Sequence, residues 1–395
     1  MPVEFLIFGA TLASVAVFHR KALAIAAAGL LAVVTCQWLF SSFPAGPGAA
    51  GLAAHFAHEW TILANLFLLL VGFALLAAHF ERSGLPRALP HFLPDDWTGA
   101  LALLAIVFVI SGFLDNIAAA LIGGAAAHIL FRKRVHVRYL VAIVAASNAG
   151  GAGSVLGDTT TTMMWIHHVS PIHVLHAYLA AVVAFLVFAP PAARAQQEFA
   201  PIIRESPGGL VIDWPRVAIV GVVIASAVLA NVSANFAAPD FAARFPVIGA
   251  AVALSLAIST AWRKPDWSVL PGAATGSAFL LCLVALASLM PVQSLPQPSW
   301  QSALVLGFVS AFFDNIPLTA LALKQGGYDW GVLAFSVGFG GSMIWFGSSA
   351  GVAICNMFPE ARSTKRWLGE GWLVALGYVA GFAVLFATLG WNPEP

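Results

Sequence analysis

Charged residues are scarce in this sequence, and their scarcity decides the class of protein. Only 9% of the 395 residues are Asp, Glu, Lys or Arg, whereas 60% are hydrophobic. Soluble domains carry about 25% charged residues, so the composition excludes an ordinary soluble domain and predicts an all-α polytopic membrane protein. The net charge of +1 also excludes the strongly basic surface of a nucleic-acid-binding protein. We therefore expect membrane lipid as a partner and no nucleic acid.

Cysteine is equally scarce, and a basic N-terminal stretch is missing. The three cysteines, Cys36, Cys282 and Cys355, lie in apolar stretches and lack the spacing of metal ligands. This pattern predicts buried, unreactive thiols. The apolar run Val3–Phe18 is not preceded by the basic residues of a cleaved signal peptide. We therefore expect this run to be the first membrane span.

Apolar stretches long enough to cross a bilayer recur along the chain. About 20 apolar residues in a helix span the hydrocarbon core. About ten transmembrane helices are predicted on this basis, at residues 3–18, 22–40, 60–78, 139–165, 174–190, 217–236, 245–262, 272–290, 330–358 and 371–391.

Two further apolar stretches, 98–131 and 299–324, carry an Asp-Asn pair near their middles. The first is too long for a single helix, so it predicts a re-entrant hairpin that turns at Asp115-Asn116. The second stretch, with Asp314-Asn315, is short enough for one helix. We treat it as a second re-entrant hairpin, because the distribution of basic residues then tests both assignments.

The Lys and Arg residues gather on one face of the membrane if both hairpins return to the side from which they enter. Only Arg244 and Lys324 then lie on the opposite face. The positive-inside rule makes the crowded face cytoplasmic and puts both termini on the outer face of a bacterial-type cytoplasmic (inner) membrane. The bias would largely vanish if the hairpins crossed fully. The crowded face holds sixteen of the eighteen basic residues: Arg20, Lys21, Arg82, Arg87, Arg132, Lys133, Arg134, Arg138, Arg194, Arg204, Arg216, Arg263, Lys264, Arg362, Lys365 and Arg366.

The chain also repeats itself. Phe113-Leu114-Asp115-Asn116-Ile117 matches Phe312-Phe313-Asp314-Asn315-Ile316, and a glycine-rich stretch follows each after about 30 residues. With the predicted topology the two halves are inverted repeats, each of three helices, a hairpin, a broken helix and a last helix. The first repeat, 1–190, ends with hairpin 98–131, broken helix 139–165 and helix 174–190. After a cytoplasmic linker at 191–215, the second repeat, 216–395, ends with hairpin 299–324, broken helix 330–358 and helix 371–391.

Two of the predicted spans contain residues that do not suit a lipid-facing helix. Ser147–Asp158 has the sequence SNAGGAGSVLGD, and Gly340–Ser349 has GGSMIWFGSS. Unsatisfied backbone groups and a buried carboxylate each cost several kcal/mol in hydrocarbon. Both spans therefore predict helices that break and meet at the membrane midplane, facing protein or a water-filled cavity. Such broken helices form the binding sites of secondary transporters.

Three of the seventeen acidic residues are predicted at membrane depth: Asp115, Asp158 and Asp314. No Lys or Arg is predicted there, so each carboxylate takes a proton or binds a cation. Competition between these two states is the working principle of a cation/proton exchanger, and it assigns proton coupling to the three aspartates. Neutral oxygens complete the candidate ion site, whose residues are Asp115, Asn116, Ser147, Asn148, Asp158, Thr159, Thr160, Asp314, Asn315, Ser348 and Ser349.

Each of these features also has a purely structural explanation. Asp115, Asp158 and Asp314 could act only as helix N-caps, a position that Asp and Asn favour. The glycines could serve only to bring helices close together. The second break has Ser348 where the first has Asp158, so any site formed by both breaks is expected to be asymmetric.

The segment Ser147–Ile166, SNAGGAGSVLGDTTTTMMWI, resembles the signature of NhaD-type sodium/proton antiporters of the ion transporter superfamily. The two Asp-Asn-Ile hairpin turns and Gly340–Ala353, GGSMIWFGSSAGVA, resemble the same family. The resemblance implies paired hairpins and broken helices, a scaffold domain with a moving transport domain, and an assembly that is often a homodimer. It also implies exchange of Na⁺ or Li⁺ for H⁺ at an ion site lined by Asp115-Asn116, Ser147-Asn148, Asp158-Thr159 and Asp314-Asn315. We expect no cofactor.

Two other functions are alternatives to sodium/proton exchange. The wider superfamily includes arsenite and citrate or dicarboxylate transporters, so ion-coupled transport of such an anion is the main alternative. The absence of Lys and Arg at membrane depth argues against an anion site. An intramembrane aspartyl protease would want a Gly-x-Gly-Asp motif, whereas Asp158 follows Val155-Leu156-Gly157. We therefore predict a transporter and not an enzyme.

Overall fold

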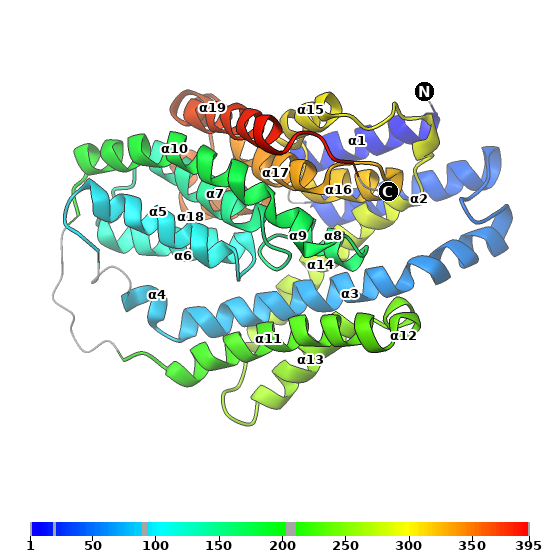
Figure 1. Cartoon of the computed structure of the whole chain (residues 1–395), viewed down its shortest axis with the longest axis horizontal. Helices are drawn as coiled ribbons and strands as arrows, with labels where there is room; N and C mark the ends of the chain where they lie inside the picture. The colour runs from blue at the N-terminus through cyan, green and yellow to red at the C-terminus, as the bar shows by residue number, and fades with distance from the viewer. Residues whose placement is uncertain (1, 19–20, 89–92, 203–210, 394–395) are drawn as a thin grey trace. The chain divides into compact units, whose positions relative to one another are not determined.

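The regular structure of this chain is helical (Figure 1). The computed structural model describes residues 2–18, 21–88, 93–202 and 211–393. Within these ranges every named element is a helix, and the only paired extended residues are Phe43 and Gly46. The predicted all-α class is therefore confirmed. Arg20, Arg204 and residues 203–210 of the predicted linker lie outside the described residues.

Several helices have the length and composition of membrane spans, and the chain is an integral membrane protein. In the described ranges six helices are long and apolar enough to cross a bilayer: Ala22–Phe40, Gly48–Arg82, Pro171–Phe199, Trp214–Ala234, Trp267–Ser288 and Thr364–Leu389. Shorter apolar helices accompany them: Val3–Val15, Trp97–Ser111, Asn116–Leu130, Val247–Ser259, Trp300–Ser310 and Trp330–Met343. The total of ten crossings and two re-entrant hairpins stays a prediction.

The chain forms two compact units, and each unit draws on both predicted repeats. Unit 1 comprises Met1–Phe80, Trp214–Pro296 and Thr319–Gln325, and unit 2 comprises Glu81–Asp213, Gln297–Leu318 and Gly326–Pro395. The first three predicted spans of each half thus fall in unit 1. The Asp-Asn turn, the glycine-rich stretch and the last helix of each half fall in unit 2.

Unit 1 is built from helices of different lengths, most of them apolar. They are α1 (Val3–Val17), α2 (Ala22–Phe40), most of α3 (Gly48–Arg82), α11 (Trp214–Ala237), α12 (Pro239–Arg244), α13 (Val247–Ser259) and α14 (Leu270–Ser288), with the short helices η3 (Trp267–Val269) and η4 (Val292–Ser294). Helix α2 packs against α1 and α14, and α11 packs against α13. The buried Asn65 of α3 accepts a hydrogen bond of 3.0 Å from the backbone N–H of Gly249 in α13.

The carboxyl end of α14 is stabilised by two side chains from other helices of unit 1. The last carbonyl groups of a helix have no partner within it and need one where water is absent. Lys324, near the end of α16 (Asn315–Gln325), donates from its ammonium to the carbonyl oxygens of Ser288 and Met290, the latter at 2.6 Å. Gln37 of α2 donates to the Leu289 carbonyl at 2.7 Å.

Unit 2 contains the interrupted helices. In chain order they are α4 (Leu85–Ala88), α5 (Trp97–Ser111), α6 (Asn116–Leu130), α7 (Val137–Ala152), α8 (Thr159–Ile166), α9 (Pro171–Leu175), α10 (Ala177–Phe199), α15 (Trp300–Ser310), the start of α16, α17 (Trp330–Gly340), η5 (Gly341–Met343), α18 (Ser349–Met357), η6 (Pro359–Ala361) and α19 (Thr364–Leu389). The helices are interrupted at both Asp-Asn pairs and at both glycine-rich stretches. Helices α5 and α6 lie side by side (Figure 1).

Helices α7 and α17 form the centre of unit 2. All residues of α17 and nearly all of α7 are buried. Helix α7 packs against α5, α6, α10, α17 and α19, and α17 packs also against α15. A helix that is apolar all round is expected where protein surrounds it on every side. The glycine-rich breaks follow directly after these two central helices, so they lie in the interior of the unit.

Two helices are longer than the apolar runs that predicted them. Helix α3 begins at Gly48, before the predicted span 60–78, because the preceding stretch is rich in alanine, the best helix former. Helix α10 continues to Phe199 through Pro190 and Pro191, so the first part of the predicted linker 191–215 is helical. Hydropathy marks the apolar part of a helix and does not mark its ends.

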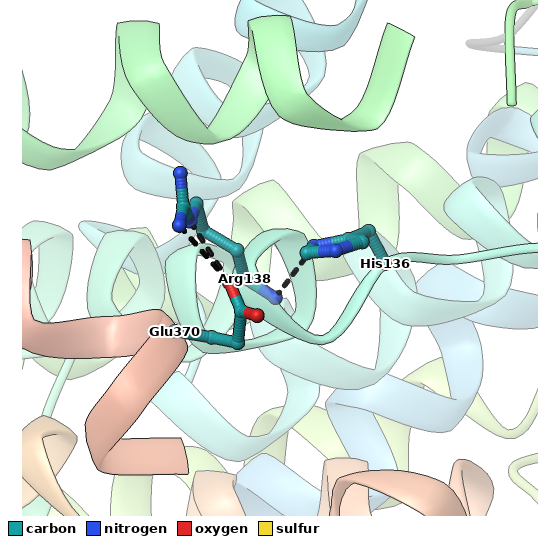
Figure 2. Close-up of polar contacts among 3 residues, drawn as sticks. All are labelled: His136, Arg138 and Glu370. Carbon is teal, nitrogen blue, oxygen red and sulfur yellow. Dashed lines mark hydrogen bonds and ion pairs between the residues drawn. The ribbon is translucent and has the colours of Figure 1, made fainter. Parts of the chain in front are cut away.

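The beginning of α7 is fixed by polar contacts to α10 and α19. Figure 2 shows that His136 caps α7, its Nδ1 accepting from the backbone N–H of Arg138 at 3.2 Å. Arg138 forms an ion pair of 3.0 Å with Glu370 of α19 (Figure 2). The buried Gln196 of α10 accepts from the backbone N–H of His136 at 2.7 Å. The partly exposed ion pair contributes little stability, so the cap and Gln196 are the main constraints.

The cap predicts a pH-dependent stability. Burial lowers the pKa of His136 below its ordinary 6.5, while Glu370 raises it and Arg138 and Arg366 lower it by smaller amounts. Neutral His136 is therefore favoured in the folded protein, and its contribution is complete above about pH 6.5 and is lost as the pH falls below that value. We expect Tm in detergent to fall between pH 7.5 and 5, and less so for His136→Asn, whose amide caps without titrating. An equal fall in both proteins would remove His136 from the effect.

Candidate functional site

Both Asp-Asn turns place an aspartate at the start of a helix. Asp115 caps α6, one of its carboxylate oxygens accepting from the backbone N–H of Ile117 at 3.1 Å. Asp314 does the same for α16, accepting from Ile316 at 3.1 Å. The structural role that the sequence allowed is therefore present. A cap occupies only one carboxylate oxygen, and the second oxygen of Asp314 accepts from the Ser349 hydroxyl at 3.2 Å.

Asp158 is the most enclosed carboxylate of the three. Its side chain is 2% exposed. It caps α8, accepting from the backbone N–H of Thr160 at 3.2 Å, and the Asn315 amide lies 3.4 Å from both of its oxygens. Asp158 is also close enough to Asp115 and Asp314 to be affected by their charges. No Lys or Arg of the described residues forms an ion pair with it.

A second, uncharged cluster surrounds Asn148, which is completely buried in α7. The Asn148 amide nitrogen donates to the hydroxyls of Ser342 at 2.9 Å and Ser348 at 3.1 Å. Its oxygen accepts from the amide of Asn116 at 3.1 Å. Ser348 caps α18, accepting from the backbone N–H of Gly351 at 3.2 Å. Asn148 therefore links the first Asp-Asn turn to the second glycine-rich break.

Equivalent residues of the two halves make equivalent contacts. Ser111 donates to the carbonyl oxygen of Ser147 at 2.5 Å, and Ser310 donates to that of Val337 at 2.7 Å. These hydroxyls supply partners for carbonyls near the end of each central helix.

The first glycine of each break permits the same close approach. A Cβ on Gly150 would overlap the carbonyl oxygen of Phe108, and a Cβ on Gly340 would overlap that of Gly307. The glycines thus let α5 approach α7, and α15 approach α17, as the structural explanation allowed.

The remaining predicted residues take different positions. Ser147 is completely buried, and its hydroxyl donates to the Val144 carbonyl of its own helix at 2.9 Å. In the described part of the chain no hydrogen bond joins the Ser147 side chain to another predicted site residue. Thr159 is half-buried, and Thr160 is completely buried.

Two residues of the site were not among those predicted. Ser342 binds the Asn148 amide, and Gly338 lies against Asp158, where a Cβ would be 3.0 Å from the carboxylate. Aligning the repeats by their glycine pairs could have indicated Gly338, because it corresponds to Asn148. Ser342 corresponds to Ala152, which gives no such signal.

The site does not resemble a resident metal centre built from acidic, histidine or cysteine side chains. Among the described residues no group of three or more such side chains lies close enough to hold a metal ion. The recorded hydrogen-bond donors to Asp158 are uncharged: the backbone N–H of Thr160 and the amide nitrogen of Asn315.

Comparison with known proteins finds sodium/proton antiporters as relatives of this chain. The chain is 29% identical over 316 residues to Sodium/proton antiporter 1 of Arabidopsis thaliana, covering 71% of this chain and 54% of the relative. It is 25% identical over 284 residues to Sodium/proton antiporter 2 of the same plant, covering 63% and 67%. A 97-residue segment is 35% identical to the Na(+)/H(+) antiporter NhaD of Halomonas elongata, covering 22% and 18%. This chain is a relative of sodium/proton antiporters.

The resemblance in the motifs is thereby confirmed, and these relatives are named as transporters and not as proteases. The chain spans about half the length of the first antiporter relative. No family model matches the sequence.

The close approach at Gly150 and Gly340 predicts that neither position accepts a side chain. Because the obstacle is backbone, Gly150→Ala or Gly340→Ala forces α5 from α7, or α15 from α17, and we expect each to cost about 1–3 kcal/mol or more. Gly369→Ala is the matched control, since nothing lies within 4 Å of its Cβ position. Tm in detergent measures the effect, and Tm equal to the control would contradict it.

Proposed function

We propose that this chain is a secondary active transporter that exchanges Na⁺ or Li⁺ for H⁺. One observation carries the proposal: Asp158, 2% exposed at a helix break, has no Lys or Arg partner among the described residues. Relatives named sodium/proton antiporters support the choice of ions. The chain would need no cofactor, because H⁺ and the cation are its only substrates.

The exchange follows from the cost of burying a charge. A carboxylate removed from water and left unpaired is unstable, and either a proton or a bound cation removes the cost. The two cannot occupy the carboxylate together. Binding of Na⁺ therefore releases H⁺, and H⁺ displaces Na⁺. Asp115 and Asp314 act on the same equilibrium, because their negative charge favours whichever cation is bound at Asp158.

We assign the ligands of the cation to side-chain oxygens near Asp158. Thr160 is completely buried two residues after Asp158, and the Ser349 hydroxyl donates to Asp314 at 3.2 Å. Hydroxyl and amide oxygens replace water around a hard cation and let it bind without a permanent countercharge. The Asn148 cluster is already satisfied internally, so we assign it to holding the two breaks together.

Alternating access would follow from the inverted repeats. All candidate site residues lie in unit 2, and unit 1 holds the first three predicted spans of each half. This division supports a transport domain, unit 2, and a scaffold, unit 1. We propose the orientation that the Lys and Arg distribution predicts, with the basic loops in the cytoplasm and both termini outside. We infer the same two inverted repeats, 1–190 and 216–395, that the sequence predicts.

The proposal predicts that Asp158→Asn and Asp115→Asn abolish exchange and leave the fold intact, because asparagine retains the cap and cannot carry a proton or a charge. The assay uses everted vesicles, acidified inside, with a pH-sensitive dye. Addition of Na⁺ or Li⁺ should dequench the dye for the wild-type chain and not for either variant.

The matched control is Asp96→Asn, because Asp96 is also an N-cap, accepting from Thr98 at 2.9 Å, but is exposed. It should retain wild-type exchange. Wild-type rates in a folded Asp158→Asn would remove Asp158 from the mechanism. Uptake of labelled citrate or arsenite without any response to cations would replace antiport by coupled anion transport.

A further inference from the structure

The two halves of unit 2 have the same backbone plan and differ in chemistry at one pair of positions. Aligning the glycine pairs, Gly150-Gly151 with Gly340-Gly341, makes Asn148 equivalent to Gly338 and Asp158 equivalent to Ser348. The first half thus has the larger residue at both positions, on the central helix and at the helix cap after the break, and the second half has the smaller one.

In three dimensions these positions pair across the halves. Asn148 contacts Ser348 at 3.1 Å, and Gly338 lies against Asp158, with 3.0 Å between the Gly338 Cβ position and Oδ2. Each pair consists of one central-helix residue and one cap residue from the opposite half. In the first pair the long side chain of Asn148 faces the short side chain of Ser348. In the second pair Gly338, which has no side chain, faces the longer side chain of Asp158.

The asparagines of the two Asp-Asn turns follow the same difference between the halves. Asn116 donates to the Asn148 side chain at 3.1 Å, whereas Asn315 has no side chain to meet at Gly338 and lies 3.4 Å from both oxygens of Asp158. Each turn asparagine therefore contacts whichever group fills the place beside the central helix. That group is an amide in one half and the carboxylate in the other.

We propose that Gly338 is a positioning residue: its missing side chain leaves the space that holds the Asp158 carboxylate beside α17. The effect of Gly338 on transport rests on the proposed function. Its effect on the position of the Asp158 carboxylate rests on geometry alone. A Cβ at 338 would lie 3.0 Å from Asp158 Oδ2 and 3.7 Å from the Ala152 Cβ, so the carboxylate is the group that must move.

The first test separates positioning from stability. Gly338→Ala should raise the half-saturating Na⁺ concentration several-fold and shift the pH profile of exchange, because it displaces the carboxylate without removing it. Its Tm should stay close to that of Gly369→Ala, since alanine favours a helix over glycine. Unchanged Na⁺ dependence and pH profile in Gly338→Ala would overturn the proposal.

The second test is a double-mutant cycle that needs no transport. Gly338→Asn alone should lower Tm because the new amide clashes with Asp158, and Asp158→Ser alone should lower it by leaving a gap and a weaker cap. Together they recreate the Asn148–Ser348 pair, so the double variant should recover most of the lost Tm and still show no exchange. Additive losses would overturn the proposal, because residues without contact do not couple.

The two proposals can fail separately. A wild-type chain that exchanges no cation, combined with recovery of Tm in the double variant, would end the proposed function and leave the placement of Asp158 standing. Exchange by the wild-type chain, combined with additive losses of Tm, would leave the proposed function standing and end the proposal about Gly338.

Discussion

Unit 2 depends on satisfying the polar groups that become exposed where helices break inside a membrane protein. Hydrocarbon offers no hydrogen bonds, so each freed carbonyl needs a partner from the protein. Ser111 and Ser310 provide one near the end of each central helix, and Tyr178 donates to the Gly150 carbonyl at 3.0 Å. At the amino ends of the helices that follow, the side chains of Asp115, Asp158 and Ser348 accept hydrogen bonds from backbone N–H groups.

The same requirement makes Asp158 exceptional. It accepts from the backbone N–H of Thr160 at 3.2 Å and lies 3.4 Å from the Asn315 amide, and no Lys or Arg of the described residues forms an ion pair with this buried carboxylate. The Asn148 amide is the opposite case. Its nitrogen donates to the hydroxyls of Ser342 and Ser348, and its oxygen accepts from the Asn116 amide, all within 3.1 Å. The satisfied amide holds structure, whereas the proposed function assigns the buried carboxylate to an exchangeable ion.

The compact units also constrain how the chain folds. Neither predicted repeat forms a unit by itself, because unit 1 and unit 2 each take segments from both halves. Helix α16 contributes to both: Asn315 at its start faces Asp158 in unit 2, and Lys324 near its end supports α14 in unit 1.

The sequence by itself determined the helical class and the positions of the breaks, and it singled out the candidate site residues. Hydropathy is a local property, and glycine, asparagine and aspartate interrupt helices through their own backbone and side-chain chemistry. Asp115, Asp158 and Asp314 could therefore be singled out without coordinates, because a carboxylate in an apolar run is conspicuous wherever the chain takes it.

The tertiary structure alone decided which of these residues meet. Asn148 pairs with Ser348 and Asn315 with Asp158 across more than 150 residues of sequence, while Ser147 remains bonded to its own helix. Ser342 and Gly338 entered the site only through packing, since a serine or a glycine carries no sign of what will lie against it. Contacts between distant segments depend on how helices pack, and a local pattern cannot encode that.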